Sequence, residues 1–347
     1  MRFYTGQHRF TCGVDLHAST MYLCILDSAG EICLHQNLPT HPDAFLEAIA
    51  PFRDDLVVGA ECMFTWYWLA DLCQTEGIAF VLGHALYMKA IHGAKAKNDK
   101  LDARKLAVML RGGAYPVAYA YPAGMRSTRD LLRRRTNLVR FRADLLAHVA
   151  NTNSQANLSA MALGGRRRAA APQVFERLQD PMTRRSVELD LAIIQFMDNQ
   201  IADIERELLV KAKEHQPRTL DILQTVPGIG PILAMTLLYE IHDLDRFPRV
   251  QDFVSYARLV ACAHESGGKR SGTGGRKIGN AFLKWAFSEA AVSQLRIDAG
   301  IRNYRNRLVK KHGKGKSLSI LAHRIGRTVY HMLKRGETFD RARFLAA

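Results

Sequence analysis

The pattern of apolar residues changes near residue 120, and this change constrains the fold more than any other feature of the sequence. Before it, short apolar runs rich in β-branched and aromatic residues alternate with turns and short helical stretches. After it, apolar residues recur every three or four positions over long stretches. A chain of 347 residues is long enough for two or three domains. We therefore expect a mixed α/β region followed by a mostly helical one.

The first region begins with strands that pair along the chain. Three apolar runs between Thr11 and Asn37 predict an antiparallel meander. Helical and strand patterns then alternate: helices are expected over residues 42–52 and 66–77, and strands over 55–62 and 79–83. This order predicts a mixed sheet covered by helices, followed by a further helix that starts near Asp99.

Two long amphipathic helices are expected in the second region, over residues 126–150 and about 187–212. Their length predicts an antiparallel helical hairpin or a dimerising coiled coil. The first of them carries seven arginines, of which Arg129, Arg133 and Arg134 are candidates for nucleic-acid contact. A charged, solvated helix face is the alternative interpretation.

Positive charge is concentrated after residue 120. Residues 1–120 contain 10 Lys and Arg against 12 Asp and Glu, a net charge of −2. The whole chain carries +16, so residues 121–347 carry +18. Such asymmetry favours a polyanionic partner, because each Lys or Arg that contacts a phosphate releases counterions. A merely soluble basic surface is the alternative.

Two glycine-containing segments of the last third are candidates for phosphate contact. The segment Val226–Gly230 is predicted to be a tight turn that exposes backbone N–H groups at a helix N-terminus, with a plain helical turn as the alternative. The segment Glu265–Asn280 is predicted to be a flexible or ligand-shaped loop, because it is rich in glycine, small polar residues and basic residues. The candidate phosphate contacts are Gly228, Gly230, Lys269, Arg270, Arg276 and Lys277.

Four acidic residues form an ordered set in the first region. Asp15 lies within an apolar strand, Glu61 ends another, and Asp99 and Asp102 share one face of a predicted helix start. Divalent cations such as Mg²⁺ prefer oxygen ligands, so the set predicts a metal site. Each acid alone has a structural alternative: Asp99 as a helix N-cap, Asp102 as a first-turn acid and Glu61 as a surface charge.

Other classes of protein are disfavoured. The six cysteines include no Cys-x-x-Cys pair and no Cys/His cluster with zinc spacing, so a thiolate metal centre is not expected. The sequence contains no secretory signal core and no apolar stretch long enough to cross a membrane. We expect a soluble, cytoplasmic protein with no membrane partner.

Several segments together resemble a known family. GVDLH around Asp15, GAECMFTWYW around Glu61 and KNDKLDARKLA around Asp99 and Asp102 are similar to the N-terminal DEDD domain of transposases of the insertion-sequence 110 family, including its 1111 subgroup. The later runs TVPGIGPILAMTLLYEI and HESGGKRSGTGGRKIGNAFLKWAFSEAA resemble the C-terminal transposase domain of that family. These segments follow the family's order and cover nearly the whole chain.

The resemblance implies three parts. Residues 1–120 would form an α/β, RuvC-like (RNase H-like) domain that holds Mg²⁺, or Mn²⁺, through the four acids. Residues 121–215 would form a basic helical or coiled-coil linker. Residues 216–347 would form a mostly α-helical C-terminal transposase domain with a helix-hairpin-helix-like element.

The resemblance also implies a mechanism and partners. The family's nucleophilic serine lies in a Glu-Ser-Gly context, which corresponds to Ser266 here, and Ser271 is its competitor. The implied partners are donor and target DNA, a structured non-coding guide RNA and other copies of the chain in a dimer or tetramer that shares the active site. The alternatives are a hydrolytic junction-resolving nuclease that uses only the carboxylates, and a non-catalytic nucleic-acid-binding protein.

Overall fold

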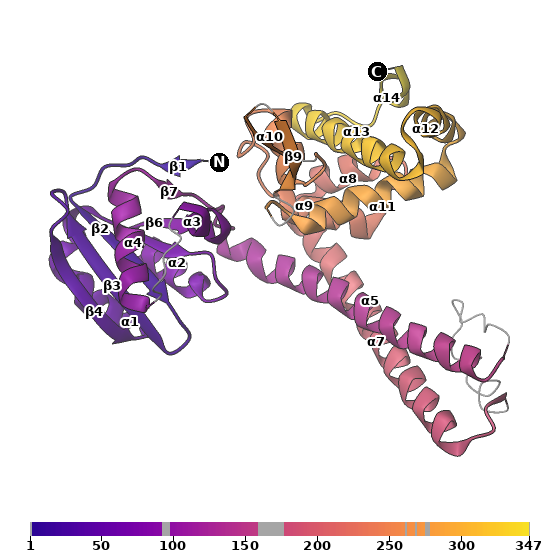
Figure 1. Ribbon diagram of the computed structural model, residues 1–347, viewed down its shortest axis with the longest axis horizontal. Coiled ribbons are helices and arrows are strands. Elements are labelled where there is room, and N and C mark those ends of the chain that lie inside the picture. Colours follow the sequence, from indigo (N-terminus) through magenta and orange to yellow (C-terminus); the bar gives the residue numbers. More distant parts are fainter. Residues whose placement is uncertain are drawn as a thin grey trace. The chain divides into compact units, whose positions relative to one another are not determined.

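The computed structural model describes residues 2–91, 98–158, 177–260, 262–267, 269–274 and 278–346. The chain divides into two compact units, Met1–Ala123 and Gly124–Ala347. The first unit is mixed α/β and the second is mostly helical, as the sequence predicts (Figure 1).

The first unit is built on a five-stranded sheet with the order β4-β3-β2-β5-β6. Strands β2, β3 and β4 pair antiparallel, which confirms the predicted meander, and β5 and β6 run parallel to β2. The strand bounds are β2 (Phe10–Leu16), β3 (Thr20–Asp27), β4 (Ile32–Pro39), β5 (Leu56–Glu61) and β6 (Ala79–Gly83). A separate pair of short strands joins β1 (Phe3–Tyr4) to β7 (Tyr115–Pro116).

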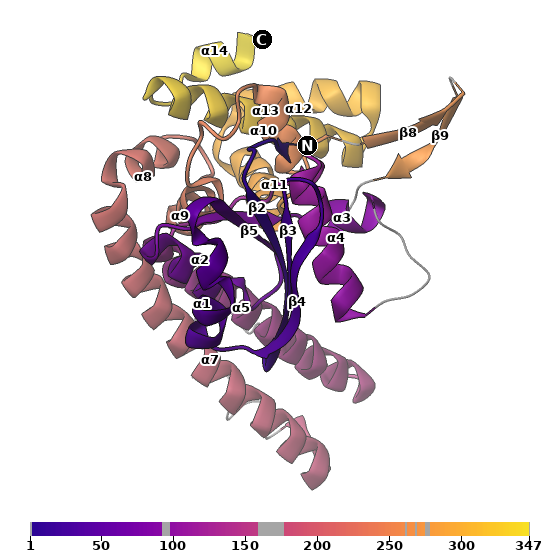
Figure 2. The same cartoon turned by 90° about the vertical axis from the view of Figure 1, so that its left-hand side faces the viewer.

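Helices cover both faces of this sheet. One face packs on α1 (Pro42–Ile49) and α2 (Trp66–Thr75), and the short 3₁₀ helix η1 (Ala50–Asp55) follows α1. The other face packs on α4 (Asp99–Arg111). Figure 2 shows α1 and α2 on one side of the sheet and α4 on the other. The remaining helix of this unit, α3 (Ala85–Ile91), follows β6.

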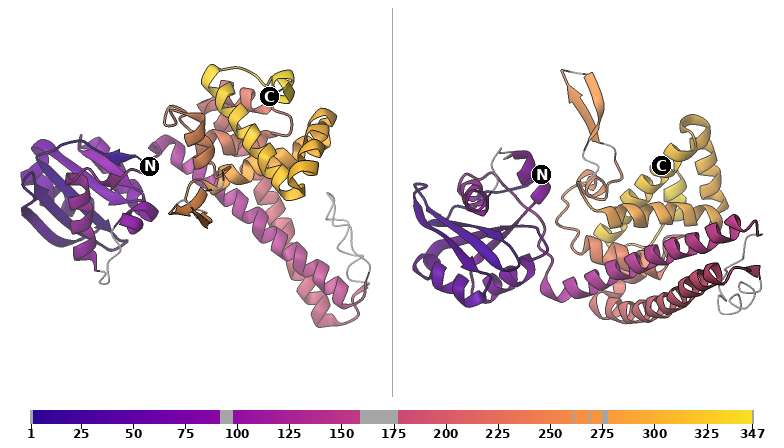
Figure 3. Two further views of the ribbon diagram at one scale, coloured as in Figure 1. Left: turned by 45° about the horizontal axis from the view of Figure 1, so that its top comes forward. Right: turned by 60° about the horizontal axis from the view of Figure 1, so that its bottom comes forward.

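The second unit contains the two long helices that the sequence predicts. Helices α5 (Ala123–Gln155) and α7 (Pro181–His215) lie side by side in Figures 1 and 3. Residue numbers rise along α5 as those of its ion-pair partners fall along α7, so the two helices are antiparallel. The pairs are Arg135–Glu205, Arg142–Asp198 and His148–Asp190.

The rest of the second unit is a helical body with one β-hairpin. Its core joins apolar residues from α5, α7 and the later helices into one cluster. The helix bounds are α8 (Pro217–Gln224), α9 (Pro231–Ile241), α10 (Val250–Tyr256), α11 (Ala281–Ile297), α12 (Ala299–His312), α13 (Lys314–Arg335) and α14 (Arg341–Ala346). Between α10 and α11, β8 (Cys262–Ser266) and β9 (Lys269–Gly274) pair antiparallel where the sequence suggested a flexible loop. Figure 3 shows this hairpin standing out from the helices of its unit.

Candidate metal centre and nucleophile hairpin

Asp15 and Glu61 lie one residue beyond the last register pair of two neighbouring parallel strands. The pairing of β2 with β5 runs from Phe10–Leu56 to Val14–Ala60, so the two acids follow that last pair side by side. Strand residues alternate between faces, and the alternate residues Val14 and Ala60 lie in the core beneath α1 and α2. Asp15 and Glu61 therefore belong to the opposite face, which α4 covers.

A glycine lets α4 approach this face closely. A Cβ at Gly13 would lie 2.2 Å from the carbonyl oxygen of Ala103 in α4, so any side chain there would push the helix away. Helix α4 starts immediately after Asn98, whose side chain accepts a hydrogen bond from the Leu101 N–H at 2.8 Å. Asn98 is the N-cap, and the carboxylate of Asp99 is therefore not required for capping.

The first turn of α4 brings Asp99 to Asp15, and His17 lies between them. The His17 Nε2 atom is 3.4 Å from Asp15 Oδ2 and 3.5 Å from Asp99 Oδ1. One ligand atom from each of the three residues lies within 4.8 Å of the others, a spacing at which the three could bind one metal ion. The set of two carboxylates and one imidazole fits a divalent cation.

The electrostatics of Asp15 also fit a cation. Burial raises the pKa of Asp15, and the negative charges of Asp99 and Asp102 raise it further, while His17 lowers it. Carboxylates crowded in this way repel one another, and a bound cation would relieve that repulsion.

Two of the four predicted acids lie outside the three-residue cluster. Asp102 Oδ1 accepts a hydrogen bond from Lys105 Nζ at 2.8 Å, one turn further along α4. Glu61 lies on β5, the strand next to that of Asp15. Ordinary strand spacing places the two backbones about 5 Å apart. The pKa of Tyr115 is raised by burial first and then by the charge of Glu61.

Sequence reasoning missed His17 and Gly13. His17 follows Asp15 by two positions, in the same GVDLH segment, and this spacing was the available signal. Gly13 precedes Asp15 by two and shares its face of the sheet, so a glycine within an apolar strand marked the close approach of α4.

Ser266 lies at the turn of the β8–β9 hairpin. Its register partner is Lys269, and Glu265 pairs with Arg270. The register shifts between His264 and Glu265, which leaves Ser271 between two pairs on the other strand. Lys269 is exposed, whereas Arg276 and Lys277 lie outside the described residues.

Residues 278–280, which precede α11, are fixed to the helical body. Asn280 is the N-cap of α11, where its side-chain oxygen accepts hydrogen bonds from the backbone N–H groups of Phe282 and Leu283. Its amide Nδ2 donates to Glu240 Oε2 at 2.7 Å. The Arg258 guanidinium donates to the carbonyl oxygens of Ile278 and Gly279 at 3.0 Å. Residues 278–280, with Glu240 and Arg258, therefore form a hydrogen-bonded base next to α11.

Arg129 and Arg133 both contribute to this base through Glu240. Glu240 is only 1% exposed, and it receives Nε hydrogen bonds from Arg129 at 3.1 Å and from Arg133 at 2.6 Å. Burial would raise the pKa of Glu240, but the bond from Arg133, both arginine charges and Asn280 outweigh it and lower that pKa. Burial of Arg129 argues against its contact with nucleic acid, whereas contact by Arg133, whose side chain is 31% exposed, and by the exposed Arg134 stays a prediction.

The two glycines of the turn before α9, Gly228 and Gly230, differ in the space around them. Gly228 has φ = +85°, and a Cβ there would lie 2.7 Å from the backbone nitrogen of Gln294 in α11. Its role is therefore close packing. Gly230 is the N-cap of α9 and has open space around its Cα, so it remains a candidate for contact.

Comparison with known proteins identifies two family models in chain order. Residues 12–155 match the model of DEDD-type IS110 proteins, described as "Transposase", and residues 220–306 match "Transposase IS116/IS110/IS902 family". None of the described helices is both long and apolar enough to cross a membrane.

Curated relatives match over most of their length. The transposase for insertion sequence element IS1111A of Coxiella burnetii is 22% identical over 344 residues, which cover 94% of this chain and 90% of the relative. A probable family 20 transposase of Pseudomonas aeruginosa is 25% identical, with coverage of 81% and 84%. With two family models and a nearly full-length relative in agreement, the chain belongs to the IS110 family of DEDD transposases.

Proposed function

We propose that this transposase cuts and rejoins DNA with a divalent-metal site on the first unit and Ser266 on the second as nucleophile. The observation that carries the proposal is the meeting of Asp15, His17 and Asp99 at the end of β2. Asp102 and Glu61 stand at its margin and complete the set of acids. Mg²⁺ or Mn²⁺ is the cation that such oxygen-rich ligands favour.

Asp15, Glu61, Asp99 and Asp102 are the residues that would hold the metal. When bound, the metal would neutralise charge on the scissile phosphate and favour departure of the leaving oxygen. His17 lies within ion-pair distance of both Asp15 and Asp99 and would help to hold the two carboxylates together.

Ser266 supplies the covalent step. Attack of its hydroxyl oxygen on phosphorus forms one P–O bond while the bond to a DNA oxygen breaks; the serine proton passes to a base, and the leaving DNA oxygen takes up a proton and becomes a free hydroxyl end. One phosphodiester replaces another, so the strand can be resealed without an external energy source. Lys269, the register partner of Ser266, is exposed, so a DNA phosphate brought to this end of the hairpin would meet a positive charge.

The remaining parts of the proposal concern partners. A structured non-coding guide RNA would pair with donor and target DNA, and a homo-oligomer would complete the active site. The positive charge after residue 120 favours these partners, because a guide RNA and two DNA duplexes require many phosphate contacts.

The test compares two substitutions with matched controls. Asp15→Asn should abolish DNA cleavage and weaken Mn²⁺ binding measured by titration calorimetry, whereas Asp43→Asn, an exposed acid on α1, should change neither. Ser266→Ala should abolish the covalent protein–DNA adduct that is trapped by denaturing electrophoresis, and Ser271→Ala should retain it.

The outcomes separate the competing functions. Cleavage without an adduct in the unaltered protein would indicate a hydrolytic nuclease. Unchanged cleavage by Asp15→Asn would show that the acids have a structural role only.

A further inference from the structure

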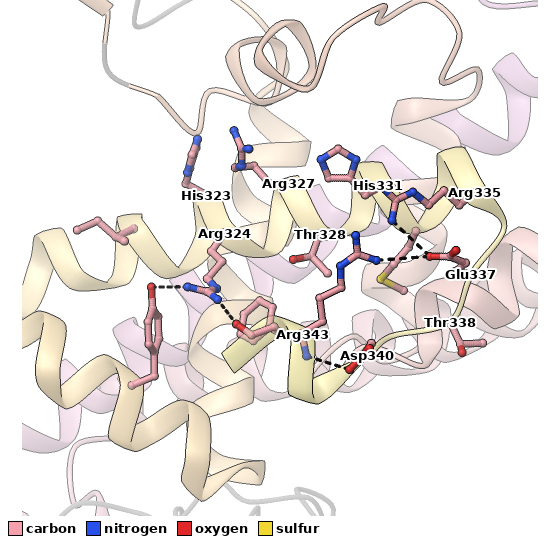
Figure 4. A pocket seen from close by; sticks show the side chains of 14 residues that line it. His323, Arg324, Arg327, Thr328, His331, Arg335, Glu337, Thr338, Asp340 and Arg343 are labelled. Carbon is pink, nitrogen blue, oxygen red and sulfur yellow. Dashed lines mark hydrogen bonds and ion pairs between the residues drawn. The ribbon is translucent and has the colours of Figure 1, made fainter. Parts of the chain in front are cut away.

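A concave pocket of about 490 Å³ lies within the second unit, apart from the hairpin and its base. It is lined by side chains from α12, α13, the segment that follows α13 and α14. Figure 4 shows these side chains, most of which are basic, hydroxylic or aromatic.

One face of α13 carries a regular row of basic side chains along this pocket. His323, Arg327, His331 and Arg335 follow one another at intervals of four residues, so they share one side of the helix. Figure 4 shows all four pointing from the same side of α13. Four residues advance a helix by about 6 Å, and the row therefore extends over roughly 18 Å. We refer to these four residues as the α13 row.

The floor of the pocket has a different, structural role. The Arg324 guanidinium donates a hydrogen bond to the Tyr304 hydroxyl at 3.0 Å and another to the Phe344 carbonyl oxygen. It also lies 4.7 Å and 5.0 Å from the centroids of the same two rings. Arg324 thus ties α12, α13 and α14 together and is not part of the row.

The cations at the rim are only weakly compensated. Glu337 is 3.7 Å from Arg335 and 3.9 Å from Arg343, so one carboxylate serves two guanidinium groups beyond hydrogen-bonding distance. The Asp340 carboxylate accepts the backbone N–H of Arg343 at 2.9 Å. Among the residues that the structure describes, Arg327 has neither a hydrogen bond nor an ion pair.

The excess of positive charge also affects the pKa values of the two histidines in the row. Burial lowers the pKa of His323, and the charge of Arg327 lowers it further. Burial also lowers the pKa of His331, followed by the charges of Arg335, Arg327 and Arg343. An anion placed along the row would reverse these repulsions.

We propose that the α13 row, together with Arg343, binds the phosphodiester backbone of a nucleic-acid strand. Guanidinium groups bind phosphate oxygens through paired, charge-assisted hydrogen bonds, and imidazole N–H groups supply further donors. The length of the row exceeds the size of one phosphate, so it fits a polyanionic strand better than a free anion. The inference rests on the proposed function only in that this function supplies DNA and RNA as partners.

The test measures binding separately from chemistry. The full-length protein with Ser266→Ala is titrated against a labelled 20-nucleotide single-stranded DNA, the matching duplex and the matching RNA at several salt concentrations. The double substitution Arg327→Gln/Arg335→Gln should lower affinity for at least one probe about tenfold or more, and the slope of log affinity against log salt should fall by about 1.5 to 2. The probe that loses most affinity identifies the strand type that occupies the row.

A matched control removes charge elsewhere on the same unit. Arg206, whose side chain is 78% exposed on α7, pairs within the described part of the chain with Asp203 three residues earlier, so Arg206→Gln should leave the row intact. Equal affinity and salt slope for the double variant and the parent, with both proteins folded by circular dichroism, would overturn the proposal. So would a change confined to the oligomeric state measured by sedimentation, because that result would assign the row to contact between chains. Loss of binding by the double variant, together with no metal-dependent DNA cleavage by the protein that keeps Ser266, would uphold the row while overturning the proposed function.

Discussion

Helices α5 and α13 are both rich in basic residues, but the structure uses their charges differently. On α5, Arg129 and Arg133 converge on the buried Glu240, and two further arginines pair with acids of α7. On α13, Arg327 has no partner among the described residues, and Arg335 shares Glu337 with Arg343. Four arginines of α5 form ion pairs within the protein. The arginines of the α13 row lack close partners and would be free to bind an anionic ligand.

The difference shows what a count of arginines leaves out. The acids that neutralise α5 come from distant parts of the chain: Glu240 follows Arg133 by 107 residues and lies on α9. Local sequence around α5 contains few acids, so it looks like an open basic surface. A basic helix is available to a ligand only when the tertiary fold leaves its cations without close carboxylate partners.

The largest expected effect comes from removing the acid that α5 depends on. Glu240→Gln leaves the buried guanidinium group of Arg129 and the partly buried one of Arg133 without a counter-charge, which should lower the free energy of unfolding by about 3–5 kcal/mol. Chemical denaturation monitored by circular dichroism measures this loss. The exposed Glu207→Gln on α7 is the matched control and should be nearly neutral. A loss below about 1 kcal/mol would break the comparison, because α5 would then hold no essential internal charge.

The same acid should make stability depend on pH. The pKa of folded Glu240 lies below its ordinary value of 4.5, so the folded state binds this proton less tightly than the unfolded state. Its contribution is complete above about pH 4.5 and is lost as pH falls through the lower, folded-state pKa. The difference in unfolding free energy between the unaltered protein and Glu240→Gln should therefore narrow from pH 6 to pH 3. A constant difference would contradict the lowered pKa.

Two adjacent arginines of α5, one paired and one exposed, allow the same comparison within a single helix. Arg135 donates to Glu205 at 2.8 Å, whereas Arg134 is exposed. Arg135→Gln should cost about 1 kcal/mol of unfolding free energy and leave the salt dependence of DNA binding unchanged. Arg134→Gln should do the reverse, with stability within about 0.5 kcal/mol and a salt slope lower by up to about 1. Equal behaviour of the two variants in both measurements would remove the distinction between internal and available arginines.

The sequence predicted those features that depend on local pattern. The meander, the α/β alternation and the two long helices follow from periods of two and 3.6 residues, and all are present. Asp15 and Asp99 were placed together from their order along the chain, and the structure brings them to His17. The β8–β9 hairpin was not predicted, because its glycines and small polar residues provide no strand period.

Other features depend on long-range packing and left little local signal. Gly228 resembled a phosphate-binding turn, but its role is set by the backbone of α11, which begins more than fifty residues later. The role of Arg129 likewise depends on Glu240, which no local pattern connects to it. The four-residue spacing of the α13 row can be read from the sequence. That few carboxylates lie near its cations can be seen only in the folded structure.

The smallest effect concerns proton uptake by the α13 row. The charged groups around His331 are Arg327 and Arg335 on α13, Glu337 and Asp340 in the segment after it, Arg324 on the pocket floor and Arg343 on α14. Burial and the nearby arginines hold the pKa of His331 below 6.5 in the free protein, and a bound phosphate would raise it. Binding then takes up protons, so affinity should rise as pH falls from 8 to 6. His331→Gln should reduce this rise by about threefold, the linkage expected for a pKa change of roughly half a unit. His215→Gln, on α7 outside the pocket, is the control for effects of histidine titration elsewhere in the protein. If both variants keep the full pH dependence of affinity, His331 takes no part in binding, and only the arginines of the row contact the phosphates.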